Sequence, residues 1–212
     1  MKKIVHVMIS NFYIEGAGYQ ENLLPRAHKR MGYDVTIITS QFCFNSKNEK
    51  GKREACTYIN NDGIKVIILE DNVRYPIISH FQPCCNGIVD TLKLENPDII
   101  FMHNLGDVDS YIVAKYASKN NTILYCDNHA DFYNTKSKGI LRCVLRHILR
   151  IPIARYISKN SKKIWGTTPW RVQFLQDFYK IDADKTDFLV MGADEQLINW
   201  NDKDIIRANK RL

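Results

Sequence analysis

The stretch TILYCDNHADFYN, residues 122–134, joins an apolar run to a crowd of polar side chains. The run that ends at Cys126 is typical of a buried strand, and the residues that follow it include two aspartates, two asparagines and His129. Polar groups are costly to bury without partners. Because ligands of open α/β sheets bind beyond the carboxyl ends of the strands, this position predicts a binding site.

Apolar, β-branched runs of the same kind recur along the chain and alternate with helix-like segments. We expect strands at 2–10, 35–40, 64–70, 97–104, 121–127, 162–168 and 187–192. We expect helices at 19–32, 110–120 and 169–180. Strands that are apolar on both faces and separated by helices indicate a parallel sheet covered on both sides. The sequence therefore predicts an α/β fold built on a Rossmann-like, doubly wound parallel sheet.

Two polar segments interrupt or follow this pattern. The stretch 45–53 is typical of an exposed loop or a hairpin insertion. Residues 201–212 resemble the opening of a helix with Asn201 or Asp202 as its N-cap. We therefore expect one Rossmann-like domain over residues 1–200, with 201–212 as the start of a linker or helix toward a further domain.

The bulk composition excludes several classes of protein. An apolar content of 45% and a charged content of 25% are ordinary for a globular protein, and the apolar runs are far shorter than the roughly 20 residues of a membrane span. The first residues lack the pattern of a secretory signal. The 6 cysteines show no CxxC pair and no metal-ligand spacing. We expect reduced thiols and a cytoplasmic location.

The positive charge is unevenly distributed. The formal net charge is +7, and between Phe132 and Gln176 there are ten Lys or Arg residues and no acidic residue. Arg142, Arg146 and Arg150 recur every four residues beside an apolar helical face, with Pro152 expected to kink or end the helix. Such a helix fits an anionic membrane surface, and it equally fits a core helix with solvated arginines. The interleaved residues are aliphatic, which disfavours nucleic acid.

The first loop contains a glycine pair, Gly16 and Gly18, before a helix. A dinucleotide fingerprint would need a third glycine where Glu21 stands, and a carboxylate after the second strand. The alternatives are a simple turn, or a loop whose backbone lets a phosphate or sugar approach closely. We favour the last interpretation.

Several segments in order resemble the N-terminal domain of family 4 retaining glycosyltransferases, which have the GT-B fold. These segments are GAGYQENLLPRAHKRMGYDVTIITS (16–40), PDIIFMHN (97–104), CDNHADF (126–132), IWGTTPWRVQFLQDFYKI (164–181) and DFLVMGADEQLI (187–198). The resemblance covers nearly the whole chain. The YQENLLP combination is similar to capsule and exopolysaccharide transferases.

This resemblance implies a hexosyltransferase that moves a sugar with retention from a UDP- or GDP-linked donor to a glycan or lipid-linked acceptor. The chain would be the acceptor-binding half, and a C-terminal domain of the same protein would hold most of the donor. The 212-residue chain by itself is then expected to be inactive. The resemblance implies no metal and no cofactor. The basic helix at 136–163, if it lies on an anionic membrane, implies a peripheral position on the inner face of the membrane.

The resemblance also assigns roles to residues. His129 matches the family histidine beside the transferred sugar, which orients the sugar and supports charge in the transition state. Gly16, Gly18 and Tyr19 match the glycine loop near the donor phosphates. Asn104, Asp107 and Asp131 follow strands and are expected to line the same cleft. In the alternative interpretation, His129 is a loop histidine hydrogen-bonded to Asp127 or Asp131.

Two other functions remain open from sequence. The chain could be a non-catalytic module that binds an anionic partner through the basic segment 136–163. It could also be half of a GT-B-like epimerase acting on nucleotide sugars. A second Rossmann-like domain with paired glutamates would distinguish the transferase from the binding module.

Overall fold

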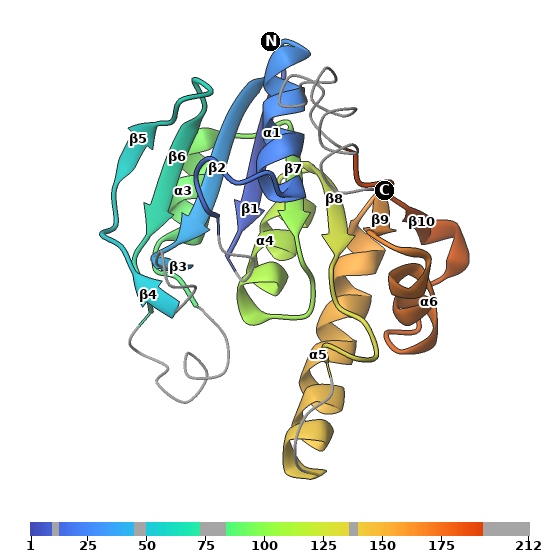
Figure 1. Cartoon of the computed structure of the whole chain (residues 1–212). Helices are drawn as coiled ribbons and strands as arrows, with labels where there is room; N and C mark the ends of the chain where they lie inside the picture. The colour runs from blue at the N-terminus through green and yellow to red at the C-terminus, as the bar shows by residue number, and fades with distance from the viewer. Residues whose placement is uncertain (10–12, 45–49, 73–83, 136–139, 193–212) are drawn as a thin grey trace, which may run out of the picture.

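The computed structural model describes residues 1–9, 13–44, 50–72, 84–135 and 140–192. Its centre is an eight-stranded, mainly parallel sheet (Figure 1). The strands of this sheet are β1 (Lys3–Met8), β2 (Asp34–Ser40), β5 (Thr57–Ile59), β6 (Lys65–Leu69), β7 (Ile99–His103), β8 (Ile123–Asn128), β9 (Lys163–Gly166) and β10 (Thr186–Phe188). The sequence-based prediction of a doubly wound α/β fold is confirmed.

The order of the strands is β10-β9-β8-β7-β1-β2-β6-β5. All neighbours pair in parallel except β5, which runs antiparallel to β6 at one edge. From β1 the chain proceeds first toward β2 and β6, and later returns to β7 on the other side of β1. The order in which the chain adds strands to the sheet therefore changes direction between β1 and β7. Open α/β sheets bind ligands at such a position.

Helices cover both faces of the sheet. They are α1 (Gln20–Arg30), α3 (Ile88–Glu95), α4 (Val108–Lys119), α5 (Ile140–Asn160) and α6 (Pro169–Asp177). In Figure 1, α1 lies in front of the sheet, whereas α3 and α4 lie behind it. Contacts of α4 with both α3 and α5 place these three helices side by side, and α6 packs against β9 and β10. No helix in the described ranges is long and apolar enough to cross a membrane.

Alternation along the strands divides the buried residues into two groups. Val5, Val7, Met102 and Leu124 face the large core that also includes residues of α3, α4, α5 and α6. The other core cluster is formed mainly by β1, β2 and β6 and includes Met8. Strands buried on both faces produce the continuous apolar runs seen in the sequence.

The amino ends of the strands are held by a compact ion-pair cluster. Glu95, at the end of α3, lies 2.7 Å from Lys3 Nζ and 2.5 Å from Lys65 Nζ, and it accepts a hydrogen bond from Thr36 Oγ1 at 3.0 Å. Burial alone would raise the pKa of Glu95, but the two lysines lower it. This edge of the sheet is therefore internally paired, and its role is structural.

The structure also departs from the sequence-based expectations. It contains α3 and β5, which were not predicted. Of the two alternatives for 45–53, the hairpin fits, because β3 (Phe42–Phe44) pairs with β4 (Lys50–Lys52). Of the two expectations for Pro152, a kink or an end of the helix, the end is wrong, because α5 continues to Asn160. Beyond the proline, Ala154 and Ile157 are fully buried, and this packing outweighs the lost backbone hydrogen bond. The predicted linker at 201–212 lies outside the described residues.

Candidate functional site

The candidate site lies at the carboxyl ends of β7 and β8, next to the point where the sheet reverses direction. The backbone N–H of Asn104 donates to the Asp127 carbonyl at 3.2 Å and joins the two strand ends. Gln20, the first residue of α1, donates from Nε2 to Asp127 Oδ2 at 3.1 Å. The end of β7, the end of β8 and the first turn of α1 are therefore brought together.

A row of three histidines runs beneath this edge on the α1 side. His6 in β1 lies between His28 of α1 and His103 of β7, with ring nitrogens 3.0 Å apart on each side. The side chain of His6 is completely buried, and burial lowers its pKa well below the ordinary value. The pKa of His28 is lowered for the same reason. His6 and His28 are therefore neutral near pH 7 and can link only through single N–H donors.

Asp127 lies next to His103 and connects the histidine row to the site. Its Oδ2 lies 2.8 Å from His103 Nδ1, and both side chains have no exposed area. Burial alone would raise the pKa of Asp127, but the charge of His103 and the proximity of His129 lower it strongly. Asp127 is therefore an ionised carboxylate in a buried position, which requires compensating charge or hydrogen bonds.

His129 lies just above Asp127 and is only partly buried. Its Nε2 is 3.5 Å from Asp127 Oδ1 and 3.6 Å from Glu21 Oε1 of α1. Burial alone would lower the pKa of His129, but these two carboxylates raise it above its ordinary value. The ring is thus fixed between two acidic groups, and about a quarter of its side chain (23%) is exposed. A proton donor held in this way suits a site where a substrate oxygen arrives.

The glycine loop precedes α1, whose first turn reaches the strand ends through Gln20, whereas Glu15, next to Gly16, accepts hydrogen bonds from Tyr58 of β5 and from Asn61 N. Gly16 has a φ of 76°, a conformation that side chains other than glycine rarely adopt, and no atom would lie within 4 Å of a Cβ there. Gly18 and Tyr19 line a surface pocket with the outer face of α1 and residues 189–192. Tyr19 precedes α1 as its N-cap and is exposed. The loop is therefore open enough for close approach of a ligand to its backbone.

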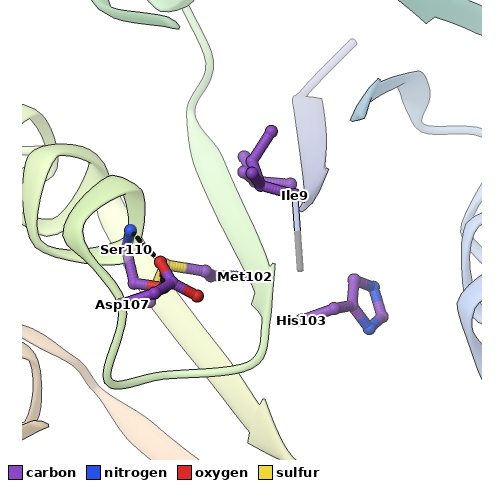
Figure 2. Close-up of a pocket in the computed structure, with 6 residues that line it drawn as sticks. Ile9, Met102, His103, Asp107 and Ser110 are labelled. Atoms are coloured by element: carbon purple, nitrogen blue, oxygen red, sulfur yellow. Dashed lines mark hydrogen bonds between the residues drawn. The ribbon is translucent and has the colours of Figure 1, made fainter. Parts of the chain in front are cut away.

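Asn104 and Asp107 lie on the loop between β7 and α4. Asn104 has a positive φ of 101° and is half-buried. Asp107 caps α4, accepting hydrogen bonds from Ser110 N at 2.7 Å and Ser110 Oγ at 2.6 Å. Figure 2 shows this pair with His103, whose ring points away from them, around a small pocket. Asp107 shapes the loop, and its role in binding substrate stays a prediction.

Asp131 organises the turn after β8. Its Oδ1 accepts hydrogen bonds from the backbone N–H groups of Tyr133 and Asn134, and its Oδ2 lies 3.5 Å from Arg171 Nε of α6. Arg171 also donates to Thr167 Oγ1 at 2.7 Å. Asp131 therefore fixes the position of the loop that carries His129.

The predicted basic face lies on α5. Figure 1 shows that the first turns of this helix extend well beyond the sheet. The side chains of Arg142 and Arg146 lie outside the described residues, and Arg150 is half-buried. Ile148, two positions before Arg150, is 62% exposed. Membrane binding by this face stays a prediction.

Sequence reasoning missed the contact of Glu21 with His129 and the contacts that link His28 and His6 to His103. Glu21 belongs to a helix almost 110 positions earlier, so only the fold brings it to the site. One signal was available. His6 and His103 each interrupt an otherwise apolar strand, and histidine on a buried strand usually has a partner.

Comparisons with known proteins agree with this architecture. No protein-family model matches the chain, and no curated protein does either. Among solved structures, a glycosyltransferase from Rickettsia africae ESF-5 aligns with 99% of this chain at 16% identity and a TM-score of 0.54. Alr3699/HepE from Anabaena, solved in complex with UDP, aligns with 100% of it at 13% identity and a TM-score of 0.57.

These similarities define the fold. The chain has a mixed α/β structure with a mainly parallel sheet, similar to the folds of GT-B glycosyltransferases. The match covers 49% of the Rickettsia protein and 50% of the Anabaena protein. The chain therefore spans about half the length of the two structures.

Proposed function

We propose that this chain is the acceptor-side half of a GT-B glycosyltransferase that moves a sugar from a UDP- or GDP-linked donor to a glycan or lipid-linked acceptor. The similarity in fold to a glycosyltransferase, and to a protein solved with UDP, supports a nucleotide-sugar donor. The chain matches about half the length of each of these two proteins, which supports its assignment to one half of such an enzyme. Retention of anomeric configuration, and an acceptor in capsule or exopolysaccharide synthesis, follow from the sequence resemblance.

The observation that supports this proposal most directly is the fixed position of His129. Asp127 and Glu21 face its Nε2, so Nδ1 is the nitrogen left for a hydroxyl of the transferred sugar. Two nearby carboxylates favour the protonated ring. In this role His129 donates a hydrogen bond to the sugar and stabilises negative charge that develops on the departing diphosphate.

The glycine loop and the second strand end complete the proposed cleft. The open backbone at Gly16 and Gly18 admits a phosphate, and Asn104 lies at the joined ends of β7 and β8. The negative charge of Glu21 would repel this phosphate. The contact between Glu21 and His129 would reduce that repulsion. The donor's nucleotide is assigned to the other half of the enzyme.

The proposal is tested with the protein encoded by the complete gene. Membranes and lipid extracts supply acceptors, and a panel of radiolabelled UDP- and GDP-sugars supplies donors. We expect transfer from one donor, and we expect His129→Asn to lower kcat by about 100-fold or more. The matched control is His28→Gln, which alters a histidine of the buried row and is expected to leave kcat within about threefold of wild type.

Each outcome has a clear meaning. Unchanged turnover in His129→Asn, with the variant folded by circular dichroism, would remove this histidine from the reaction. Absence of transfer from every donor would contradict the transferase assignment. The anomeric configuration of the product, read by NMR, tests retention separately, and inversion would refute that part alone.

A further inference from the structure

His103 Nδ1, Asp127 Oδ1 and His129 Nε2, at the carboxyl edge of the sheet, are buried polar atoms with no hydrogen-bond partner among the described residues, as is Gln20 Oε1 beside them. The ligand atoms that His103, Asp127 and His129 offer all lie within 4.8 Å of one another. Buried polar atoms in folded proteins nearly always have partners, so three without hydrogen bonds at one place need a common explanation.

The contact between His103 and Asp127 does not provide that explanation. The 2.8 Å separation of His103 Nδ1 and Asp127 Oδ2 lacks the alignment of a hydrogen bond, since Nδ1 remains without a partner. The Asp127–His129 separation of 3.5 Å is too long for a charge-assisted hydrogen bond, which typically measures about 2.7–2.9 Å. Both imidazole nitrogens therefore point toward a carboxylate that neither of them engages well.

We propose that His103, Asp127 and His129 bind a divalent transition-metal ion, with Zn²⁺ the best match and Glu21 the adjacent fourth donor. Zinc binds imidazole nitrogen and carboxylate oxygen at about 2.0–2.2 Å in a tetrahedron, so its ligand atoms lie roughly 3.3–3.5 Å apart. The separations here are 2.8 Å from His103 Nδ1 to Asp127 Oδ2, 3.5 Å from Asp127 Oδ1 to His129 Nε2 and 3.6 Å from His129 Nε2 to Glu21 Oε1, so Asp127 turns one oxygen to each histidine. Small shifts of side chains would close the polyhedron.

Charge supports the same assignment. Asp127 is completely buried, and Glu21 exposes only 16% of its side chain. One divalent cation neutralises both carboxylates while the two imidazoles bind in their neutral form.

The histidine row provides the outer support that metal-bound histidines usually have. When His103 Nδ1 binds an ion, its Nε2–H donates to His6 Nδ1, and His6 Nε2–H donates to His28 Nδ1. Without an ion, His103 carries its proton on Nδ1, facing Asp127, and its Nε2 accepts from His6 Nδ1–H. His6 Nε2 then accepts from His28 Nδ1–H, so every hydrogen bond in the row runs in the opposite direction. Metal binding therefore selects the Nε2–H tautomer of His6 and His28, which is a readout that does not depend on activity.

The ion differs from the sequence-based expectation of no metal. It would join the ends of β7 and β8 to α1 and place positive charge at the rim. With the ion bound at Nε2, the His129 ring is neutral rather than protonated, and the ion supplies the positive charge. Its Nδ1–H still donates to a sugar hydroxyl, so metal binding and the proposed sugar contact are compatible. The inference concerns a site for a cation, and its test requires neither donor nor acceptor.

The experiment uses the full chain prepared without a polyhistidine tag and treated with a chelator. Zinc is titrated by calorimetry and counted by mass spectrometry, and Co²⁺ reports geometry through its ligand-field absorption. We expect one tight site per chain, with the bands of a tetrahedral nitrogen–oxygen site. His129→Ala should lower the affinity by about 100-fold or more. The control is Lys93→Gln at an exposed residue of α3 outside the histidine row, which should leave the affinity unchanged.

A second measurement guards against indirect effects of mutation. In ¹⁵N-histidine spectra of the wild-type chain, zinc should convert His6 and His28 to the Nε2–H tautomer. The proposal is overturned by binding that survives in His129→Ala, by sulfur-to-cobalt charge-transfer bands that indicate cysteine ligands, or by tautomers that zinc leaves unchanged. Loss of sugar transfer with intact zinc binding would contradict only the proposed function.

Discussion

The substitution Gly166→Ala tests how closely α6 is packed onto the end of β9. A Cβ at position 166 would lie 2.4 Å from Val172 N, 2.7 Å from Arg171 C and 2.7 Å from Val172 Cγ2. The nearest of these atoms belongs to the backbone, so no side-chain rotation relieves the overlap. The first turn of α6 would have to move by about 1 Å to reach an ordinary contact.

This movement has a cost that the structure allows us to bound. Phe174 and Leu175 of α6 are fully buried, so a shift of the helix disturbs the packing around both side chains. Overpacking typically costs 1–3 kcal/mol, and a backbone clash belongs at the upper end, so we expect a loss of about 3 kcal/mol. For a chain of this size, that lowers Tm by roughly 6–12 °C.

Urea unfolding followed by circular dichroism measures this loss. Gly51→Ala in β4 is the matched control, since its Cβ would meet only Cys43 Sγ at an ordinary 3.9 Å. We expect the control to stay within about 0.5 kcal/mol of wild type. Equal stability of Gly166→Ala and the control would mean that α6 does not lie where the structure places it. The anchoring of Asp131 through Arg171 would then lose its basis.

Two further predictions concern charge. Burial and the neighbouring charge of Asp107 raise the pKa of Asp109 to about 7, so the folded state favours the protonated acid and stability falls as pH rises from about 4 through 7. Asp109→Asn should abolish about 3 kcal/mol of this loss, measured as the difference in unfolding free energy between pH 5 and pH 8, and an unchanged difference would refute the assignment. We also propose that α5 binds anionic membranes through Arg142 and Arg146, so the chain should sediment with anionic vesicles and be released by salt. Arg142→Glu with Arg146→Glu should abolish sedimentation, and equal recovery with neutral vesicles would leave α5 as a core helix only.

The central strands were predictable because they are buried on both faces. All seven expected strands are present, and all but β2 are shorter than expected; the run predicted at 97–104, for example, forms β7 over Ile99–His103. Neither α3 nor β5 was predicted. β5 has only three residues at the sheet edge, and α3 has eight, so neither is long enough to establish a periodic pattern.

The position of His129 was predictable from local sequence, whereas its surroundings were not. A polar residue just past a buried strand lies at the ligand-binding edge in any parallel sheet. Its contact with Glu21 depends on how α1 crosses the sheet, which no local pattern specifies. The glycine loop could be located, but its nearness to His129 follows only from the contacts of Gln20 and Glu21.

The histidine row depends on strand register. β1 and β7 pair with His6 opposite Phe101, so His103 lies two residues further along β7 and points to the same face as Phe101. A shift of one residue would turn His103 toward the apolar core and leave Asp127 without its neighbour. The register that buries the apolar residues of β7 is therefore also the register that assembles the site. Selection for a packed core and selection for the polar cluster act on the same strand pairing, which is why an apolar strand can contain a histidine at this position.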